Sequence, residues 1–246
     1  MNNTPIPIIL IFLLISCTPS GENTPGAQTA PSNTVPEYDI EDGWELIYET
    51  DFSEPLDPEN WKIEMEPEPN SSAGVIDGKL VLNTGAGVTV WLNKLLEGDL
   101  LITYRRTVVM EDGPNDRLSD LNQFWMATDP RNENLFTRDG SFASYDSLSM
   151  YYAGVGGNYN STTRFRKYQG DGEKTLLFDF DTEEYLLRPN HEYEVQLRVE
   201  GDEASYWLDG ALFFHYRDPE PLEWGYFGFR STWSRHEIDE LKVYGK

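Results

Sequence analysis

The sequence has little of the two side chains that most often build catalytic triads and zinc sites. Among its 246 residues are one cysteine, Cys17, and three histidines, His191, His215 and His236. A single cysteine excludes an internal disulfide and leaves no ligand set for a zinc site of the Cys/His type. The histidines are scattered through polar or turn-rich sequence, so we do not expect a Ser-His-Asp or Cys-His catalytic arrangement.

Positive charge is also in short supply. The chain carries 19 lysines and arginines against 43 aspartates and glutamates, which gives a formal net charge of −24. Such a charge repels nucleic acid and anionic lipid headgroups, so neither is an expected partner. It does not exclude an anionic ligand, because a local cluster of arginines can still bind one.

No hydrophobic run is long enough to cross a bilayer. Residues 8–15 form the apolar run IILIFLLI, whose length suits the core of a signal peptide. The string LISC at residues 14–17 resembles the lipobox of bacterial lipoproteins, which implies that Cys17 is lipidated and becomes the mature N-terminus. An ordinary signal peptide is the alternative, because no Lys or Arg precedes the apolar run.

The segment that follows is rich in proline. Residues 18–37 hold four prolines and almost no large apolar side chain, a composition typical of a flexible tether. We therefore predict a lipoprotein signal peptide at residues 1–16, a lipidated Cys17 with its tether at residues 17–37, and one folded domain at residues 38–246. The protein would be anchored to a membrane through its N-terminal lipid, in the periplasm or at the cell surface.

The rest of the sequence has the pattern of an all-β domain. Aromatic side chains, which suit pleated sheets, make up 13% of the chain. Hairpin turns are expected at Asp77-Gly78 and Asp209-Gly210. Alternation predicts a hairpin at 74–83 and strands at 44–50, 87–93, 99–109, 121–128, 146–153, 192–200, 204–208, 212–216, 225–230 and 237–244. Residues 176–187 show no clean period. Strands at this spacing, without a helix longer than a turn or two, indicate a β-sandwich of two antiparallel sheets.

Both ends of this domain resemble the concanavalin A-like lectin/glucanase superfamily. The string DFSEPLDPENWKIE at residues 51–64 resembles its opening strands, and GYFGFR at 225–230 and IDELKVY at 238–244 resemble its closing strands. The resemblance covers residues 38–246 and implies a jelly-roll β-sandwich. The E-x-D-x-x-E strand motif of the superfamily's laminarinase-type enzymes does not occur.

Longer strings resemble a family of uncharacterised domains from gut and marine Bacteroidetes. They are DRLSDLNQFWMATDPRN, LFTR, YYAGVGGNYNSTTRFRKY and GYFGFRSTWSR. Members of that family occur in clusters devoted to polysaccharide breakdown, so the resemblance implies glycan processing outside the cytoplasm and brings no catalytic residues. The layout is also similar to the 3-keto-disaccharide hydrolase domains of the superfamily, without a shared site motif.

One predicted strand is unusually rich in side chains that bind ligands. Residues 115–131, NDRLSDLNQFWMATDPR, combine Asp, Arg, Asn, Gln and Trp. If residues 121–128 form one strand, Gln123 and Trp125 share one face, and residues 122, 124 and 126 share the other. We expect the second face to be core and the first to bind a glycan, with a ring that stacks on a sugar and an amide that binds hydroxyls.

Neighbouring strands are expected to add arginines and tyrosines to this concave face. They are Tyr151, Arg164, Arg166, Tyr168 and Arg230. The prediction requires that Gln123, Trp125, Arg164 and Arg230 share one concave surface. The alternative is that the arginines pair with carboxylates on a solvated face. Arg106 poses a related question, because a charge on an apolar strand face needs either a buried ion partner or a site to reach into.

Several chemistries fit these residue types. A glycosidase needs two carboxylates, for which Asp116, Asp120 and Asp146 are candidates. A β-eliminating lyase needs groups that neutralise a uronate carboxylate, and Tyr151 or Tyr159 as acid and base, with a pKa lowered by nearby arginines. A carbohydrate-binding module needs the same face without catalysis, and a structural or adhesive surface protein needs no site at all.

We therefore favour an extracytoplasmic enzyme that acts on a polysaccharide or oligosaccharide, with uronate glycans among the candidates, by β-elimination or hydrolysis. The predicted catalytic residues are Tyr151, Tyr159 and Asp120, and the predicted substrate-binding residues are Arg117, Gln123, Trp125, Arg164, Arg166 and Arg230. The alternatives are a non-catalytic carbohydrate-binding module and a 3-keto-glycoside hydrolase or lyase. No cofactor or catalytic metal is expected, while a structural Ca²⁺ is compatible with the many oxygen ligands.

Overall fold

The computed structural model describes residues 43–246. The predicted signal peptide at 1–16, the tether at 17–37 and the lipidation of Cys17 lie outside the described residues, as do residues 38–42 of the predicted domain. Over the described range, no helix combines the length and the apolar character that crossing a membrane requires.

The regular secondary structure of the described residues is almost entirely β-strand. The strands are β1 (Glu45–Thr50), β2 (Trp61–Met65), β3 (Ser72–Ile76), β4 (Lys79–Glu97), β5 (Leu100–Val108), β6 (Asn122–Thr128), β7 (Ser149–Gly156), β8 (Thr162–Gln169), β9 (Lys174–Phe180), β10 (Glu192–Glu200), β11 (Glu203–Leu208), β12 (Ala211–Arg217) and β13 (Trp224–Gly245). Three single turns of helix accompany them, η2 (Phe142–Tyr145), α1 (Gly157–Asn160) and η3 (Glu183–Tyr185). The predicted hairpins are confirmed, since Asp77-Gly78 joins β3 to β4 and Asp209-Gly210 joins β11 to β12.

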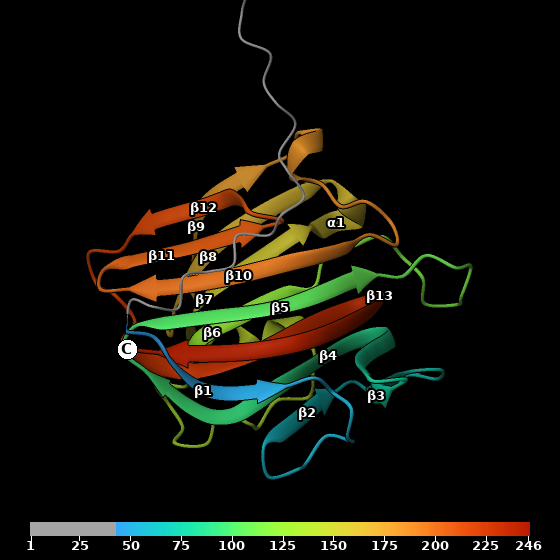
Figure 1. Cartoon of the computed structure of the whole chain (residues 1–246), viewed down its shortest axis with the longest axis horizontal. Helices are drawn as coiled ribbons and strands as arrows, with labels where there is room; N and C mark the ends of the chain where they lie inside the picture. The colour runs from blue at the N-terminus through green and yellow to red at the C-terminus, as the bar shows by residue number, and fades with distance from the viewer. Residues whose placement is uncertain (1–42) are drawn as a thin grey trace, which may run out of the picture. The chain divides into compact units, whose positions relative to one another are not determined.

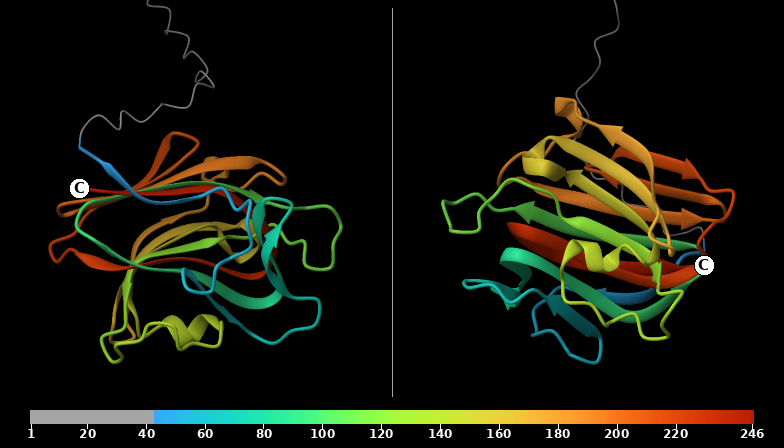
Figure 2. Two further views of the ribbon diagram at one scale, coloured as in Figure 1. Left: turned by 60° about the horizontal axis from the view of Figure 1, so that its bottom comes forward. Right: turned by 180° about the vertical axis from the view of Figure 1, so that it is seen from behind.

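The strands form one antiparallel sheet that folds over into two layers (Figure 1). Its order is β12-β11-β10-β5-β13-β6-β7-β8-β9. The long strand β13 belongs to both layers, because its C-terminal half pairs with β5 and its N-terminal half with β6. We call β5, β10, β11 and β12 with the adjoining half of β13 the first layer, and β6 to β9 with the other half the second layer (Figure 2). The predicted sandwich of two antiparallel layers is confirmed.

The main core lies between the two layers. Tyr104 of β5 packs edge-on against Phe229 of β13, with ring centres 4.9 Å apart. A second apolar cluster covers the opposite face of the second layer, which we call its outer face. There, Phe124 of β6 packs on Trp91 and on Tyr145, a residue of the segment 129–148 that crosses this face. Strand β6 is therefore buried on both faces.

Two strands are longer than the sequence predicts. Strand β4 continues through the expected break between residues 83 and 87, and β13 continues through the expected break between residues 230 and 237. In these stretches both strands are rich in glycine or polar residues, a composition typical of loops. The ladder between the two strands shifts register at Trp233, and such an irregularity lets the pairing continue through this sequence. Residues 174–180, which include part of the segment without a clear period, form the edge strand β9.

Arg106 points into the main core and is 1% exposed. Its guanidinium carbon lies 5.6 Å from the ring centre of Tyr193. Among the described residues, its nitrogen atoms have no hydrogen-bond partner and no carboxylate at ion-pair distance. Arg106 therefore neither forms the buried ion pair considered from the sequence nor reaches the pocket described below.

Candidate functional site

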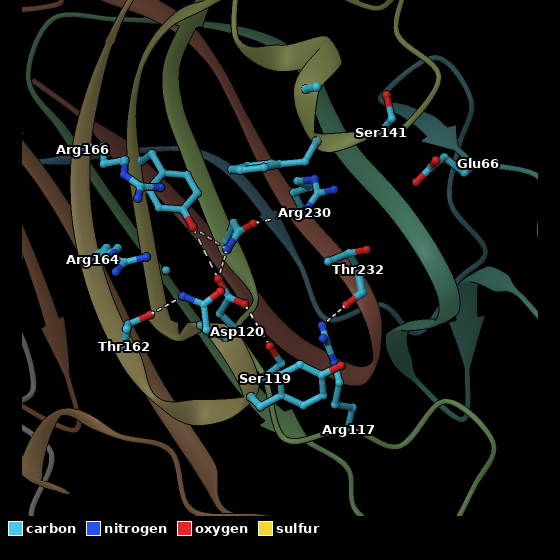
Figure 3. A pocket seen from close by; sticks show the side chains of 18 residues that line it. Glu66, Arg117, Ser119, Asp120, Ser141, Thr162, Arg164, Arg166, Arg230 and Thr232 are labelled. Carbon is cyan, nitrogen blue, oxygen red and sulfur yellow. Dashed lines mark hydrogen bonds between the residues drawn. The ribbon is translucent and has the colours of Figure 1, made fainter. Parts of the chain in front are cut away.

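A pocket of about 560 Å³ opens on the outer face of the second layer (Figure 3). Its floor is formed by β6, β7, β8 and β13, because alternate residues of these strands point outward. Its walls come from the loop before β6, the turn α1 and the segment around η2. Six of the nine predicted catalytic and substrate-binding residues line it, namely Arg117, Asp120, Tyr159, Arg164, Arg166 and Arg230.

Gln123 and Trp125 do not reach this pocket, so the prediction that their face of β6 binds a glycan is wrong, whereas Phe124 and Met126 are buried as predicted. Trp125 is 1% exposed and stacks in the main core on Phe165, with ring centres 5.6 Å apart. Gln123 is fully buried and donates a hydrogen bond to the carbonyl of Leu121 (2.7 Å). Of the four residues expected on one surface, only Arg164 and Arg230 share it. The outward face belongs instead to Asn122 and Phe124.

Tyr151 is likewise a core residue. Its hydroxyl donates to Asp218 (2.6 Å) and accepts a hydrogen bond from the Leu222 amide (3.2 Å). Burial, with the hydrogen bond to Asp218, raises the pKa of Tyr151 far above its usual value. The prediction of Tyr151 as an acid or base is therefore contradicted by its position, because it lies in the main core and does not line the pocket. Tyr168 faces the same side of β8 as Arg164 and Arg166, but it lies in the apolar cluster beside the pocket.

The polar centre of the pocket is a cluster of Asp120, Asn122 and Tyr152. The side-chain amide of Asn122 donates to a carboxylate oxygen of Asp120 and to the hydroxyl of Tyr152 (3.0 Å). Ser119 donates to the other oxygen of Asp120 (3.1 Å). Burial and the nearby Asp120 raise the pKa of Tyr152 well above its usual value, so its hydroxyl remains protonated at neutral pH.

This cluster closes over Gly154, which pairs with Asn122 across β7 and β6. A Cβ atom at position 154 would lie 2.5 Å from the Tyr152 hydroxyl and 2.7 Å from a carboxylate oxygen of Asp120. Glycine is therefore needed here for space. The sequence signal was the glycine-rich stretch at 154–157, which predicts a close approach.

Arg230 is the most deeply buried cation of the pocket, with 3% of its surface exposed. Its guanidinium lies over the ring of Phe142 at 4.6 Å, 3.4 Å from the side-chain oxygen of Asn122 and 3.5 Å from the carbonyl of Gly140. Within the described residues no carboxylate lies at ion-pair distance, although Asp120 acts on its charge from farther away. Burial lowers the pKa of Arg230 below its usual value.

The other three arginines differ in how they are held. Arg164 is neutralised by Asp179, which accepts two hydrogen bonds from it (2.9 and 3.2 Å). Arg166 is half-buried, lies over the ring of Tyr152 at 5.6 Å and has no carboxylate at ion-pair distance in the described chain. Arg117 donates to the backbone carbonyls of Thr232 and Trp233. Among the described residues, only one of the four pocket arginines, Arg164, is thus paired with an acid.

Tyr159 stands at the mouth of the pocket and is 63% exposed. It is the centre of a left-handed turn in which Asn158, Tyr159 and Asn160 have φ of 53°, 60° and 57°. Asparagine tolerates this conformation, but for a tyrosine it costs about 1–2 kcal/mol. The turn places the tyrosine ring beside Arg117, whose guanidinium carbon is 4.8 Å from the ring centre.

Two carboxylates face the pocket, Asp120 and Glu66. Figure 3 shows them on different sides, with Arg230 and Thr232 between them in that view. Glu66 accepts a hydrogen bond from the Gly87 amide (2.7 Å). Glu66 and Tyr152 were not predicted from the sequence, because no local pattern marks either residue as part of a site and the fold creates their neighbourhood.

The other acids considered from the sequence have structural contacts outside the pocket. Asp116 accepts hydrogen bonds from the amides of Glu111 and Gly113 (2.6 and 3.0 Å) and so caps a turn. Asp146 pairs with Lys174 (2.8 Å). Across residues 43–246, no group of three or more His, Cys, Asp and Glu side chains is arranged to hold a metal ion.

Comparison with known proteins identifies a family and a fold. A family model described as "Domain of unknown function (DUF6250)" matches residues 82–241. None of the curated proteins matches the chain. A protein of unknown function with a galectin-like fold from Bacillus subtilis has a TM-score of 0.66 at 16% identity, and the match covers 81% of this chain and 97% of that one.

Two further structures have names that refer to carbohydrate. The carbohydrate binding module CBM66 from Bacillus subtilis has a TM-score of 0.51 at 14% identity, over 74% of this chain and 93% of its own. An endo-β-1,3-glucanase from Pyrococcus furiosus has a TM-score of 0.57 at 11% identity, over 82% and 94%. At these identities the likeness shows the fold alone, a galectin-like and concanavalin A-like jelly roll, and it confirms the concanavalin A-like jelly roll predicted from the sequence.

Proposed function

The chain belongs to the DUF6250 family, and we propose that it binds a uronate-containing glycan in the arginine-lined pocket on the outer face of its second layer. The ligand class is a polysaccharide or oligosaccharide in which at least one sugar carries a carboxylate. The arginines bind this carboxylate, and the surrounding amide, hydroxyl and carboxylate groups bind the sugar hydroxyls.

The observation that carries this proposal is the burial of Arg230 without an acidic partner at ion-pair distance among residues 43–246. Burying a charge is costly unless it is paired and fully hydrogen-bonded. The acceptors that Arg230 has, on Asn122 and Gly140, are 3.4 and 3.5 Å away, at the long limit of a hydrogen bond. A ligand carboxylate supplies two oxygen atoms in the geometry that a guanidinium group binds best.

The charge of the whole chain strengthens this argument. At a net charge of −24 the surface as a whole repels anions, so an anionic ligand needs a local positive region. The pocket is such a region, because Arg117, Arg166 and Arg230 have no acidic partner at ion-pair distance within the described residues. A cleft with low-dielectric walls focuses the field of these charges on its ligand.

The groups around the arginines suit a sugar. Ser119, Asn122, Thr162 and Asp120 line the pocket and offer both donors and acceptors for hydroxyl groups. Structures of the same fold include a carbohydrate binding module and an endo-β-1,3-glucanase. The resemblance of several strings to a domain family from polysaccharide-degradation clusters supports the same ligand class.

β-Elimination of the bound uronate is the second candidate function, and the Asp120–Asn122–Tyr152 cluster favours it. Asp120 removes the proton from the carbon next to the carboxylate, whose developing charge Arg230 and Arg166 stabilise. The electron pair forms a carbon–carbon double bond and expels the glycosidic oxygen, which takes the hydroxyl proton of Tyr152. The proton on Asp120 then returns to Tyr152, whose hydroxyl lies 3.4 Å from that carboxylate.

A panel of uronate and neutral glycans tests both candidates. We expect calorimetric binding of uronate glycans and weak or absent binding of neutral ones. Lyase activity would produce new ultraviolet absorbance from the unsaturated product, whereas hydrolysis would produce reducing ends without it. Binding with neither product supports a carbohydrate-binding module. Failure to bind any uronate glycan would refute the proposal.

We also propose that the domain works outside the cytoplasm on a lipid anchor at Cys17. The apolar run at 8–15 and the string LISC support this, together with the tether at 18–37. Expression of the full chain in a bacterium that processes lipoproteins should place it in the membrane fraction. The variant Cys17→Ser should move it to the soluble extracytoplasmic fraction. Equal membrane association of both forms would contradict a lipid anchor.

A further inference from the structure

Three side chains form a stack at the mouth of the pocket. The guanidinium carbon of Arg117 lies 4.8 Å from the ring centre of Tyr159 and 5.1 Å from that of Trp233. The two rings meet edge to face, with centres 6.0 Å apart at an angle of 85°. We call Arg117, Tyr159 and Trp233 the rim stack. Arg117 and Tyr159 also line the pocket, so the rim stack is continuous with it.

The rim stack is held rigidly. The guanidinium of Arg117 donates to the backbone carbonyls of Thr232 and Trp233, which fixes it relative to β13. The backbone sets the direction in which both side chains leave the chain, since Tyr159 and Trp233 have φ of 60° and 45°. Trp233 stands where the register between β13 and β4 shifts, and such an irregularity redirects a side chain away from the regular strand face.

Core packing does not account for this arrangement. Tyr159 is 63% exposed and Trp233 is 43% exposed, so both rings keep much of their surface in water. Two large aromatic side chains in a backbone conformation that only glycine and asparagine adopt readily carry a conformational cost that little burial offsets. Such strain is typical of ligand-binding positions. Arg117 covers part of each ring, and the remaining ring surface is free to contact a ligand.

We propose that the rim stack is a second sugar subsite, which binds the residue next to the one held in the pocket. The inference rests on the proposed function and adds the length of the ligand. An aromatic ring offers an apolar face to the C–H face of a sugar, and the hydrogen-bond donors of Arg117 lie beside it. A glycan that leaves the pocket past Arg117 and Tyr159 meets Trp233. The preferred ligand is therefore at least a disaccharide.

The test compares ligands of different length. Calorimetry measures the affinity for galacturonate, glucuronate and mannuronate, each as the free monosaccharide, the disaccharide and the tetrasaccharide. For the wild-type protein we expect about a tenfold gain in affinity from monosaccharide to disaccharide, the size of one aromatic contact. Trp233→Ala should lose this gain and keep the affinity for the monosaccharide. Trp233→Phe should retain most of the gain, because it keeps a ring.

Trp224 provides the matched control. It is 52% exposed, lies at the start of the same strand and is not part of the pocket. Trp224→Ala should therefore behave as wild type with every ligand. The subsite is refuted if the wild type binds monosaccharide and disaccharide equally, or if Trp233→Ala leaves the gain intact or weakens both ligands alike. If the wild type binds none of these sugars, the proposed function fails, and the subsite with it.

Discussion

Arg230 and Asn122 are register partners on β13 and β6, and the guanidinium of Arg230 lies 3.4 Å from the side-chain oxygen of Asn122. The amide of the same Asn122 donates to Asp120 and to Tyr152. A neutral amide therefore stands between the buried cation and the carboxylate of Asp120. This arrangement leaves Arg230 available for an anionic ligand and Asp120 available for sugar hydroxyls or for proton transfer.

The variant Gly154→Ala tests whether the polar cluster forms the binding site. The added Cβ would lie 2.5 Å from the Tyr152 hydroxyl, so Tyr152 and Asp120 must move. We expect the free energy of unfolding to fall by about 1–3 kcal/mol, which leaves the protein folded. The affinity for a uronate glycan should fall as well, because the displaced Tyr152 and Asp120 no longer fit the ligand. Denaturant unfolding and calorimetry measure the two effects.

Gly74→Ala is the control for this substitution. Gly74 also stands in a strand, and a Cβ there meets nothing within 4 Å. This variant should bind as wild type. If Gly154→Ala also keeps wild-type affinity, the cluster does not contact the ligand.

The buried tyrosines predict a loss of stability at alkaline pH. Burial raises the folded-state pKa most strongly at six tyrosines, Tyr104, Tyr145, Tyr151, Tyr152, Tyr168 and Tyr206, the last to about 12. Their unfolded-state pKa is about 10. Because the folded values are higher, the stabilisation is fully present below pH ~10 and is lost as the pH rises through the folded values.

Thermal unfolding between neutral pH and pH ~11 measures this loss, and the ultraviolet absorbance of tyrosinate reports ionisation. We expect a steep fall in melting temperature above pH ~10, with the buried tyrosines ionising only as the protein unfolds. Ionisation of all 14 tyrosines near pH 10 while the circular dichroism remains native would contradict the burial of these rings.

Trp125→Ala separates the two assignments of β6. Because Trp125 packs against Tyr151 and Phe165 between the layers, truncation should cost about 3–5 kcal/mol of unfolding free energy. The exposed Trp224→Ala should cost far less. A Trp125→Ala variant with normal stability and reduced glycan affinity would instead support the glycan-facing assignment that the sequence suggests.

Much of the fold could be predicted from the sequence, because alternation and turn chemistry are local. The Asp77-Gly78 and Asp209-Gly210 hairpins and the shared face of Arg164 and Arg166 depend on a few neighbouring residues. The faces of β6 could not be assigned from the sequence. Residues 129–148 cover its outer face and the main core covers its inner face, so both faces are buried. Parity alone cannot distinguish two buried faces.

The site was predictable only in part for a related reason. Arginines are rare in this acidic chain, so they are easily selected as candidate anion-binding residues, and all four predicted arginines line the pocket. Glu66 reaches the pocket from the loop after β2, and Tyr152 has the same local pattern as its core neighbour Tyr151. Their roles arise from tertiary contacts that leave no local sequence signal.

The proposed function depends on a ligand carboxylate bound by arginines that have no acidic partner among the described residues. Its most direct test is the affinity for a uronate oligosaccharide compared with that for the carboxyl-reduced counterpart. The wild type should prefer the uronate by about tenfold or more, as expected for a charge-assisted hydrogen bond worth about 1.5–3 kcal/mol. Arg230→Gln and the half-buried Arg166→Gln should each reduce this preference. Arg217→Gln, at an exposed arginine paired with Asp202, should keep it. Equal affinity of the wild type for both oligosaccharides, or an unchanged preference in both pocket variants, would contradict the account.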